Sequence, residues 1–263
     1  MIISHKYRYV FISVPHTACT TIRRELCEFY EGQEILHKHA HYNEFLKIAN
    51  PEERKYFAFA GIRNPLDEAV SYYFKLKSNH RGNYTKPEKL VENGGFVTQT
   101  QLERYRFVTD HQADFATYFK HFYRTPYKNT YTWAHEELDY LVRYENLQED
   151  FGKALELCGI QPVRWLPLFN KTADKNPDYL TYYPADTYEQ AGQVFGPFMK
   201  KWGYHFPPEW RIKSPSGLAQ FKYRVSEAIS IFCLRNLRWD PDRCNRAFNF
   251  SSRMLNKITL GTV

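Results

Sequence analysis

The residues best suited to chemistry in this chain belong to a short hydroxyl-rich segment, Pro15–Thr21, which follows an apolar run, Tyr9–Val14. The run contains neighbouring bulky β-formers, as in a buried strand, and helical apolar spacing resumes after it at Ile22, Leu26 and Phe29. Amides at the start of a helix attract anions, and the hydroxyls of Thr17, Thr20 and Thr21 add donors. The segment therefore predicts a phosphate-binding strand, loop and helix.

This loop differs from the loop of nucleoside triphosphatases. Their pattern, G-x-x-x-x-G-K-[ST], needs two glycines and a lysine, and none of these lies between Ser13 and Ile22. A P-loop-like kinase would also need an acidic residue for Mg²⁺, and none is evident from the sequence. A kinase is therefore the weakest of the functional alternatives.

A second strand, loop and helix are predicted between Phe57 and Tyr73. The apolar stretch ends at Arg63, and Pro65 follows at a position where proline favours the first turn of a helix. Ser71 lies about two helical turns further along. An arginine at a strand end and a serine on the next helix suit a second anion, and the alternative is a surface arginine beside an ordinary helical serine.

Three histidines, His37, His39 and His41, alternate along the chain between these two segments. An extended backbone would place all three side chains on one face, as a metal site requires. No cysteine or carboxylate cluster adjoins them, so we expect no metal. A neutral imidazole can also accept a proton near neutral pH.

Taken together, the sequences of these segments resemble the motifs of the PAPS-dependent sulfotransferases. PAPS is 3′-phosphoadenosine 5′-phosphosulfate. Pro15–Thr21 is similar to their 5′-phosphosulfate loop, P-K-T-[AG]-[GS]-T-[ST], and Arg63–Tyr73 to their 3′-phosphate motif, R-N-P-x-x-x-x-V-S-x-Y. Asp139–Leu147 contains the R-Y-E-N-L wording common in the family, which core packing explains without chemistry. The resemblance spans roughly Tyr9–Tyr204.

Two further segments resemble the polysaccharide sulfotransferases, especially the heparan sulfate and uronyl 2-O-sulfotransferases. Their H-x-H-x-x-Y-x-x-F run holds the catalytic histidines, and His37, His39, Tyr42 and Phe45 match it. Leu168–Lys175 resembles the loop that covers their nucleotide, with Asn170 in place of the first arginine.

The resemblance implies a role for each matching residue. The 5′-phosphosulfate would bind Pro15, His16, Thr17, Ala18, Cys19, Thr20 and Thr21; the 3′-phosphate would bind Arg63 and Ser71; and Lys171 and Thr172 would close over the nucleotide. His39, assisted by His37, would deprotonate a hydroxyl acceptor, which we expect to be a glycan.

The main departure from the family is His16, which stands where a lysine would contact the leaving phosphate. A histidine is charged only when protonated, so catalysis through His16 would depend on pH. The departure also leaves open a catalytically silent protein that binds PAPS or its product PAP, 3′-phosphoadenosine 5′-phosphate.

Composition bounds the architecture and the partners. The chain has 263 residues, 43% of them hydrophobic, which is enough for one substantial core. From the strand–loop–helix segments and the resemblance, we expect an α/β fold: a P-loop-like three-layer domain with a central parallel sheet over residues 1–206, and a helical extension over 207–263 packed on the same domain. Nothing in Met1–Val10 resembles a signal sequence, and five cysteines without paired spacing suit the cytoplasm.

The extension carries most of the positive charge. It contains ten Lys or Arg residues and four Asp or Glu residues, whereas the whole chain has a net charge of +7. Its apolar residues follow helical spacing, so we expect them to pack on the domain and leave the basic side outward. A solvated face or contact with an acidic surface would follow, and we expect no nucleic acid because no binding module accompanies the charge. The apolar residues are Leu218, Phe221, Val225, Ala228, Ile229 and Phe232.

Overall fold

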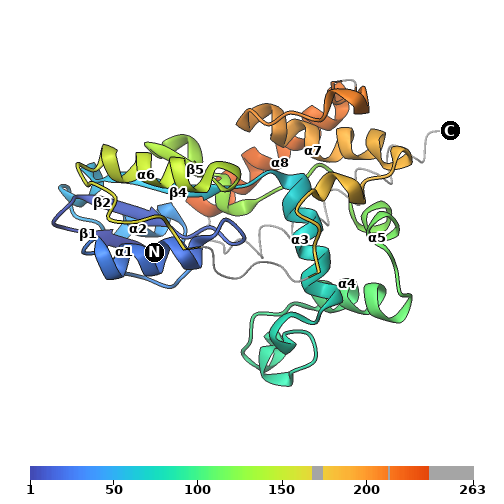
Figure 1. The fold of residues 1–263 in the computed structure, drawn as a ribbon, viewed down its shortest axis with the longest axis horizontal. Coiled ribbons are helices and arrows are strands. Elements are labelled where there is room, and N and C mark those ends of the chain that lie inside the picture. Colours follow the sequence, from blue (N-terminus) through green and yellow to red (C-terminus); the bar gives the residue numbers. More distant parts are fainter. Residues whose placement is uncertain (168–173, 213, 237–263) are drawn as a thin grey trace. The chain divides into compact units, whose positions relative to one another are not determined.

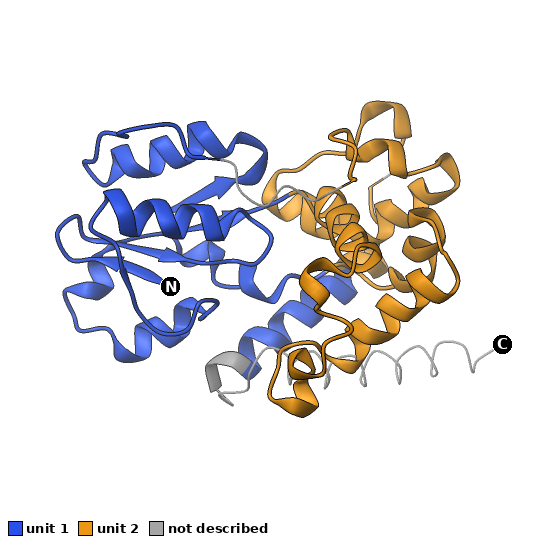
Figure 2. Cartoon of the chain, turned by 60° about the horizontal axis from the view of Figure 1, so that its bottom comes forward, with its two compact units in different colours: residues 1–63, 128–169, 221–263 blue, residues 64–127, 170–220 orange. Residues whose placement is uncertain are grey.

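A computed structural model describes residues 1–167, 174–212 and 214–236. Its contacts divide the chain into two compact units, coloured separately in Figure 2. Unit 1 comprises residues 1–63, 128–169 and 221–263, and unit 2 comprises residues 64–127 and 170–220. The domain boundary predicted at residue 206 stays a prediction.

Unit 1 is built on a sheet with the strand order β3-β1-β2-β4-β5, whose strands are labelled in Figure 1 except for β3. β2, β4 and β5 are parallel, and Phe59 of β4 lies opposite Phe11 of β2 and Tyr140 of β5. The strands are β1 (Ile2–Ser4), β2 (Tyr9–Ile12), β3 (Gln33–Glu34), β4 (Phe57–Ile62) and β5 (Tyr140–Arg143).

The predicted parallel sheet is therefore correct for the three strands that lead into the motifs and wrong for the other two. β1 is antiparallel to both β2 and β3. Only four residues, His5 to Arg8, join β1 to β2. A parallel neighbour needs a crossover of a dozen or more residues, so this short connection permits only a hairpin.

Both faces of the sheet are buried, which makes unit 1 a three-layer structure. Successive residues of β2 enter opposite clusters: Tyr9 and Phe11 pack with α1 and α6, whereas Val10 and Ile12 pack with α2. This alternation follows from the two-residue period of a strand. The helices are α1 (Cys19–Phe29), α2 (Tyr42–Ile48) and α6 (Leu147–Leu157), with short 3₁₀ helices at Glu53–Lys55, Thr130–Thr132, His135–Glu137 and Tyr144–Asn146.

The ends of these helices follow local sequence signals. α6 ends before Gly159, which has φ of +73°, as the glycine predicted for a helix end. In unit 2, α3 (Pro65–Lys77) begins with proline, and the Asn64 side chain accepts a hydrogen bond from the Leu66 amide. Both boundaries were predictable from residues within one turn.

Unit 2 packs its helices around a single aromatic-rich cluster that includes Tyr73, Phe115, Tyr118, Phe119 and Phe195. Many of its rings meet edge to face, for example Tyr73 and Phe115 at 5.7 Å between centroids. Besides α3, the helices are α4 (Gln99–Asp110), α5 (Phe115–Phe122) and α7 (Tyr188–Trp202), with 3₁₀ helices at His80–Gly82, Pro87–Lys89, Val91–Asn93, Tyr179–Tyr182, Ala185–Thr187 and Pro208–Trp210.

The helix predicted near the C-terminus is α8 (Gly217–Asn236), but its buried face is not the predicted one. Leu218, Phe221, Ile229 and Phe232 are 59%, 64%, 39% and 56% exposed. The buried positions are instead Ala219, Tyr223, Ser226, Ser230 and Cys233. The helix therefore buries small residues together with Tyr223 and leaves its bulky apolar residues exposed.

Four cysteines lie in the described residues, namely Cys19, Cys27, Cys158 and Cys233, and all four are free thiols. Within the same part of the chain, no helix has the length and apolar content needed to cross a membrane.

Candidate anion and proton-transfer site

The loop Pro15–Thr21 adopts a backbone suited to holding an anion. His16 and Ala18 have φ of +67° and +59°, whereas the residues around them do not have positive φ. A backbone whose successive residues alternate between right-handed and left-handed conformations turns its amides toward one point. Such an arrangement is an anion-binding nest. Left-handed conformations are unusual for alanine, so surrounding contacts must hold this loop.

One side chain of the loop is used in an internal hydrogen bond, whereas several of its backbone amides are not. The Thr17 hydroxyl, which we expected to serve as a donor to the anion, is buried and donates to the Val14 carbonyl at 2.9 Å. Within the described residues, the amides of Thr17, Ala18 and Thr20 donate to no other group. Binding by Thr17 would therefore use its amide rather than its hydroxyl.

Gly61, near the end of β4, allows the loop to lie against the sheet. A Cβ atom at this position would lie 2.3 Å from Thr17 Oγ1 and 2.6 Å from Thr17 Cβ. Real Cβ atoms do not approach so closely, and Thr17 is itself held by its bond to Val14. No local sequence pattern indicates this contact, because the two residues lie 44 positions apart.

Arg63 also contacts this loop. Its guanidinium is buried, donates to the His16 carbonyl at 3.0 Å, and lies 3.9 Å above the centre of the Tyr144 ring. Tyr144 belongs to the R-Y-E-N-L segment, to which the sequence assigned only a packing role. Its ring orients the arginine by a cation–π contact.

Of the other residues predicted to contact the nucleotide, the structure describes Ser71. Ser71 is buried on α3 of unit 2. In that unit, Lys175 forms an ion pair with Asp67 through two largely buried side chains. Lys171 and Thr172 lie outside the described residues, so their predicted contacts stay predictions.

His39 is held in the orientation that a proton acceptor needs. Its Nδ1 lies 2.6 Å from the Ser13 carbonyl, and a carbonyl only accepts, so Nδ1 carries the proton. Within the described part of the chain, Nε2 has no hydrogen-bond partner. Burial lowers the pKa of His39 below its usual value, with the Ser13 hydrogen bond opposing that shift. The neutral imidazole therefore presents its lone pair on Nε2.

The neighbouring histidines have different surroundings. His37 is exposed and its Nε2 lies 3.2 Å from a Glu44 oxygen. His41 is buried at the start of α2, stacks on Tyr131 with 4.6 Å between ring centres, and has its pKa lowered to about 4 by burial. Among the described residues, no group of three or more His, Cys, Asp or Glu is placed to hold a metal ion.

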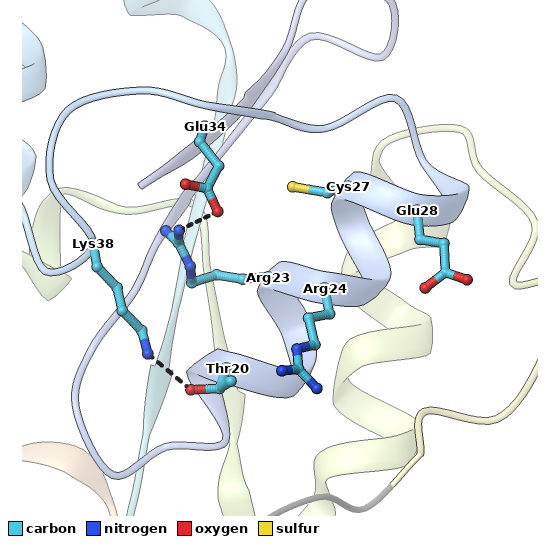
Figure 3. A pocket seen from close by; sticks show the side chains of 7 residues that line it. All are labelled: Thr20, Arg23, Arg24, Cys27, Glu28, Glu34 and Lys38. Carbon is cyan, nitrogen blue, oxygen red and sulfur yellow. Dashed lines mark hydrogen bonds and ion pairs between the residues drawn. The ribbon is translucent and has the colours of Figure 1, made fainter.

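An open pocket of about 450 Å³ lies beside the start of α1 (Figure 3). In it, Arg23 donates to Glu34 at 2.6 Å, and Lys38 donates to the Thr20 hydroxyl at 3.0 Å. The sequence did not single out Lys38, although it lies between two histidines of the motif. The pocket is lined by Thr20, Arg23, Arg24, Cys27, Glu28, Glu34 and Lys38.

A model of the sulfotransferase family matches residues 1–177 of the 263-residue chain. The match includes β1 to β5, the loop Pro15–Thr21, the histidine segment and Arg63. No curated protein and no solved structure matches the chain significantly.

Replacement of Gly61 by Ala tests the contact between the loop and β4. The added methyl group has no space against Thr17, so we expect the free energy of unfolding to fall by about 1–3 kcal/mol, as for other overpacked cores. Urea unfolding measures this value. Gly152→Ala on α6 is the matched control, because its Cβ would meet nothing closer than 3.9 Å. Equal stability of the two variants would show that the loop does not depend on the close approach.

Proposed function

Because the chain belongs to the sulfotransferase family, we propose that it transfers the sulfonate group of PAPS to a hydroxyl of a carbohydrate. The observation that carries the proposal is the 2.6 Å contact between His39 Nδ1 and the Ser13 carbonyl. Ser13 lies two residues before the loop, so the contact would hold a proton acceptor beside it. A loop for an anion and a base for a hydroxyl are the two parts that sulfonate transfer requires.

The loop Pro15–Thr21 would bind the 5′-phosphosulfate through its amides and through the Thr20 and Thr21 hydroxyls. Its alternating backbone and unused amides support this assignment. Arg63 and Ser71 would bind the 3′-phosphate, and Lys171 and Thr172 would cover the nucleotide; these roles rest on the motif resemblance.

PAPS supplies the sulfonate group and a phosphate as leaving group. The acceptor hydroxyl attacks sulfur, its proton moves to Nε2 of His39, and the bond between sulfur and the phosphate oxygen breaks to release PAP. The Ser13 carbonyl stabilises the imidazolium that results, because it accepts from Nδ1–H in both protonation states. His37 is engaged with Glu44, which supports a secondary role for it.

A carbohydrate acceptor is proposed because the histidine run resembles that of the 2-O-sulfotransferases. The segment from Asn79 to Thr132 would shape the acceptor site, since aromatic side chains stack on sugar rings. The alternative is a silent protein that binds PAPS or PAP, and the specific observation that favours it is His16 at the position of the family lysine.

We further propose that the protein acts in the cytoplasm and contacts an acidic surface through its basic C-terminal region. The exposed apolar residues of α8, such as Phe221 and Phe232, would accompany the charges in such a contact.

The nucleotide site is tested by thermal stability with PAP and with AMP, which lacks the 3′-phosphate. We expect PAP to raise the melting temperature more than AMP does, because a ligand that prefers the folded state stabilises it. Arg63→Ala should remove most of the advantage of PAP. Arg54→Ala is the control, since Arg54 also donates to a backbone carbonyl but from another part of unit 1. Equal losses for PAP and AMP in Arg63→Ala would mean that Arg63 only supports the loop.

The base is tested with His39→Ala and His39→Gln, assayed by transfer of radioactive sulfonate from PAPS to a panel of glycans, phenols and lipids. We expect turnover to fall by at least about 100-fold in both variants, which is the usual contribution of a general base. PAP affinity should stay within about twofold, because His39 contacts the acceptor. His5→Ala, at an exposed histidine that contacts Tyr56, is the control. Normal turnover in His39→Ala would exclude this role.

The dependence of turnover on pH gives a separate test of the same residue. His39 must be neutral to accept a proton, and burial lowers its pKa. The rate should therefore stay high on acidification past pH 6.5, the usual value for histidine, and fall only as the pH drops through the lowered pKa. An acid limb centred above pH 6.5 in the rate at saturating substrate would contradict the assignment.

A further inference from the structure

The loop that would bind the 5′-phosphosulfate contains no side chain with a permanent positive charge. Pro15–Thr21 holds one titratable cation, His16, and a histidine loses its charge near neutral pH. Transfer of the sulfonate group develops negative charge on the leaving phosphate, and a fixed cation there lowers the barrier. A sulfotransferase that works at neutral pH therefore needs a cation from outside the loop.

Lys38 brings an ammonium group to the loop. Its Nζ donates to Thr20 Oγ1 at 3.0 Å, and Figure 3 shows the side chain extending toward Thr20 at the start of α1. None of the ion pairs among the described residues includes Lys38. Glu34, which lines the same pocket, is paired with Arg23 instead. Among the described residues, no carboxylate therefore neutralises the charge of Lys38.

The backbone around Lys38 fixes it together with the proposed base. A turn closes the segment, since the Ala40 amide donates to the His37 carbonyl at 3.1 Å. The next residue, His39, is bound to Ser13 before the loop, while Lys38 is bound to Thr20 at its far end. Two consecutive side chains thus contact the chain just before the loop and near the end of the loop.

The hydrogen bond to Thr20 also sets which way that hydroxyl donates. An ammonium only donates, so Thr20 Oγ1 accepts from Lys38 and keeps its own proton for another acceptor. A phosphate oxygen placed at the loop would receive that proton and would lie within reach of the ammonium. Hydrogen bonds to charged groups are stronger than neutral ones, so the pair forms an effective phosphate contact.

On the proposed function, we infer that Lys38 is a catalytic residue that contacts the 5′-phosphate of the nucleotide and neutralises it as the sulfonate group leaves. Lys38 thereby supplies the charge that the family lysine would supply from the position of His16. The acceptor loses its proton to His39, the bond between sulfur and the phosphate oxygen breaks, and the electron pair stays on the phosphate beside Lys38. The chain would then be active rather than silent.

The decisive experiment compares the affinities of PAP and adenosine 3′-monophosphate by calorimetry, because the two differ only in the 5′-phosphate. In Lys38→Ala, PAP should bind at least about tenfold more weakly, as for a lost hydrogen bond to a charged group, and the monophosphate should bind as before. Lys38→Arg should restore most of the PAP affinity. Lys47→Ala, at an exposed lysine of α2 that belongs to none of the ion pairs among the described residues, is the matched control.

Two further readouts separate the possible failures. The tenfold difference between wild type and Lys38→Ala should persist at pH 8.5, where a histidine is neutral and an ammonium is charged. Turnover with PAPS should fall more than PAP affinity, because charge on the phosphate grows as the bond breaks. Unchanged PAP affinity in Lys38→Ala would overturn the role of Lys38 alone, whereas a wild-type protein that binds no PAP would overturn the proposed function with it.

Discussion

Parallel pairing of β2 with β4, with Phe11 opposite Phe59, brings the carboxyl ends of both strands to one edge of the sheet. The loop after β2 and Arg63 after β4 meet there, so Arg63 reaches the His16 carbonyl and Thr17 rests against Gly61. A side chain at position 61 would collide with Thr17 of the loop. The anion-binding conformation therefore depends on a sheet register and on the absence of one methyl group.

The three histidines of the segment His37–His41 have different surroundings and therefore different properties. His41 is buried against Tyr131 and starts a helix, His37 is exposed and pairs with Glu44, and His39 is half-buried with one nitrogen held by Ser13. Only His39 combines a fixed tautomer with an available lone pair. Burial and a single carbonyl, rather than the spacing of the histidines, distinguish His39 from its two neighbours.

The basic residues around the loop likewise differ in the groups that they contact. Arg23 is paired with Glu34 and bonded to Ser13, and Arg63 is held between Tyr144 and His16. Both arginines therefore have fixed structural contacts in unit 1. Among the described residues, Lys38 belongs to none of the ion pairs and donates to the Thr20 hydroxyl, so its charge is available to the loop. The electrostatics of the site follow from this pairing and not from the number of basic residues.

The sequence alone determined the features that depend on neighbours within a few residues. The strands at Tyr9 and Phe57, the starts of α1 and α3 and the end of α6 at Gly159 follow from periodicity, proline and glycine, which act locally. Only the tertiary structure decided the antiparallel β1, the contact of Gly61 with Thr17, the partners of Lys38 and His39, and the buried face of α8. These contacts join residues as many as 44 positions apart or depend on how closely elements pack, and no local pattern encodes either distance or packing.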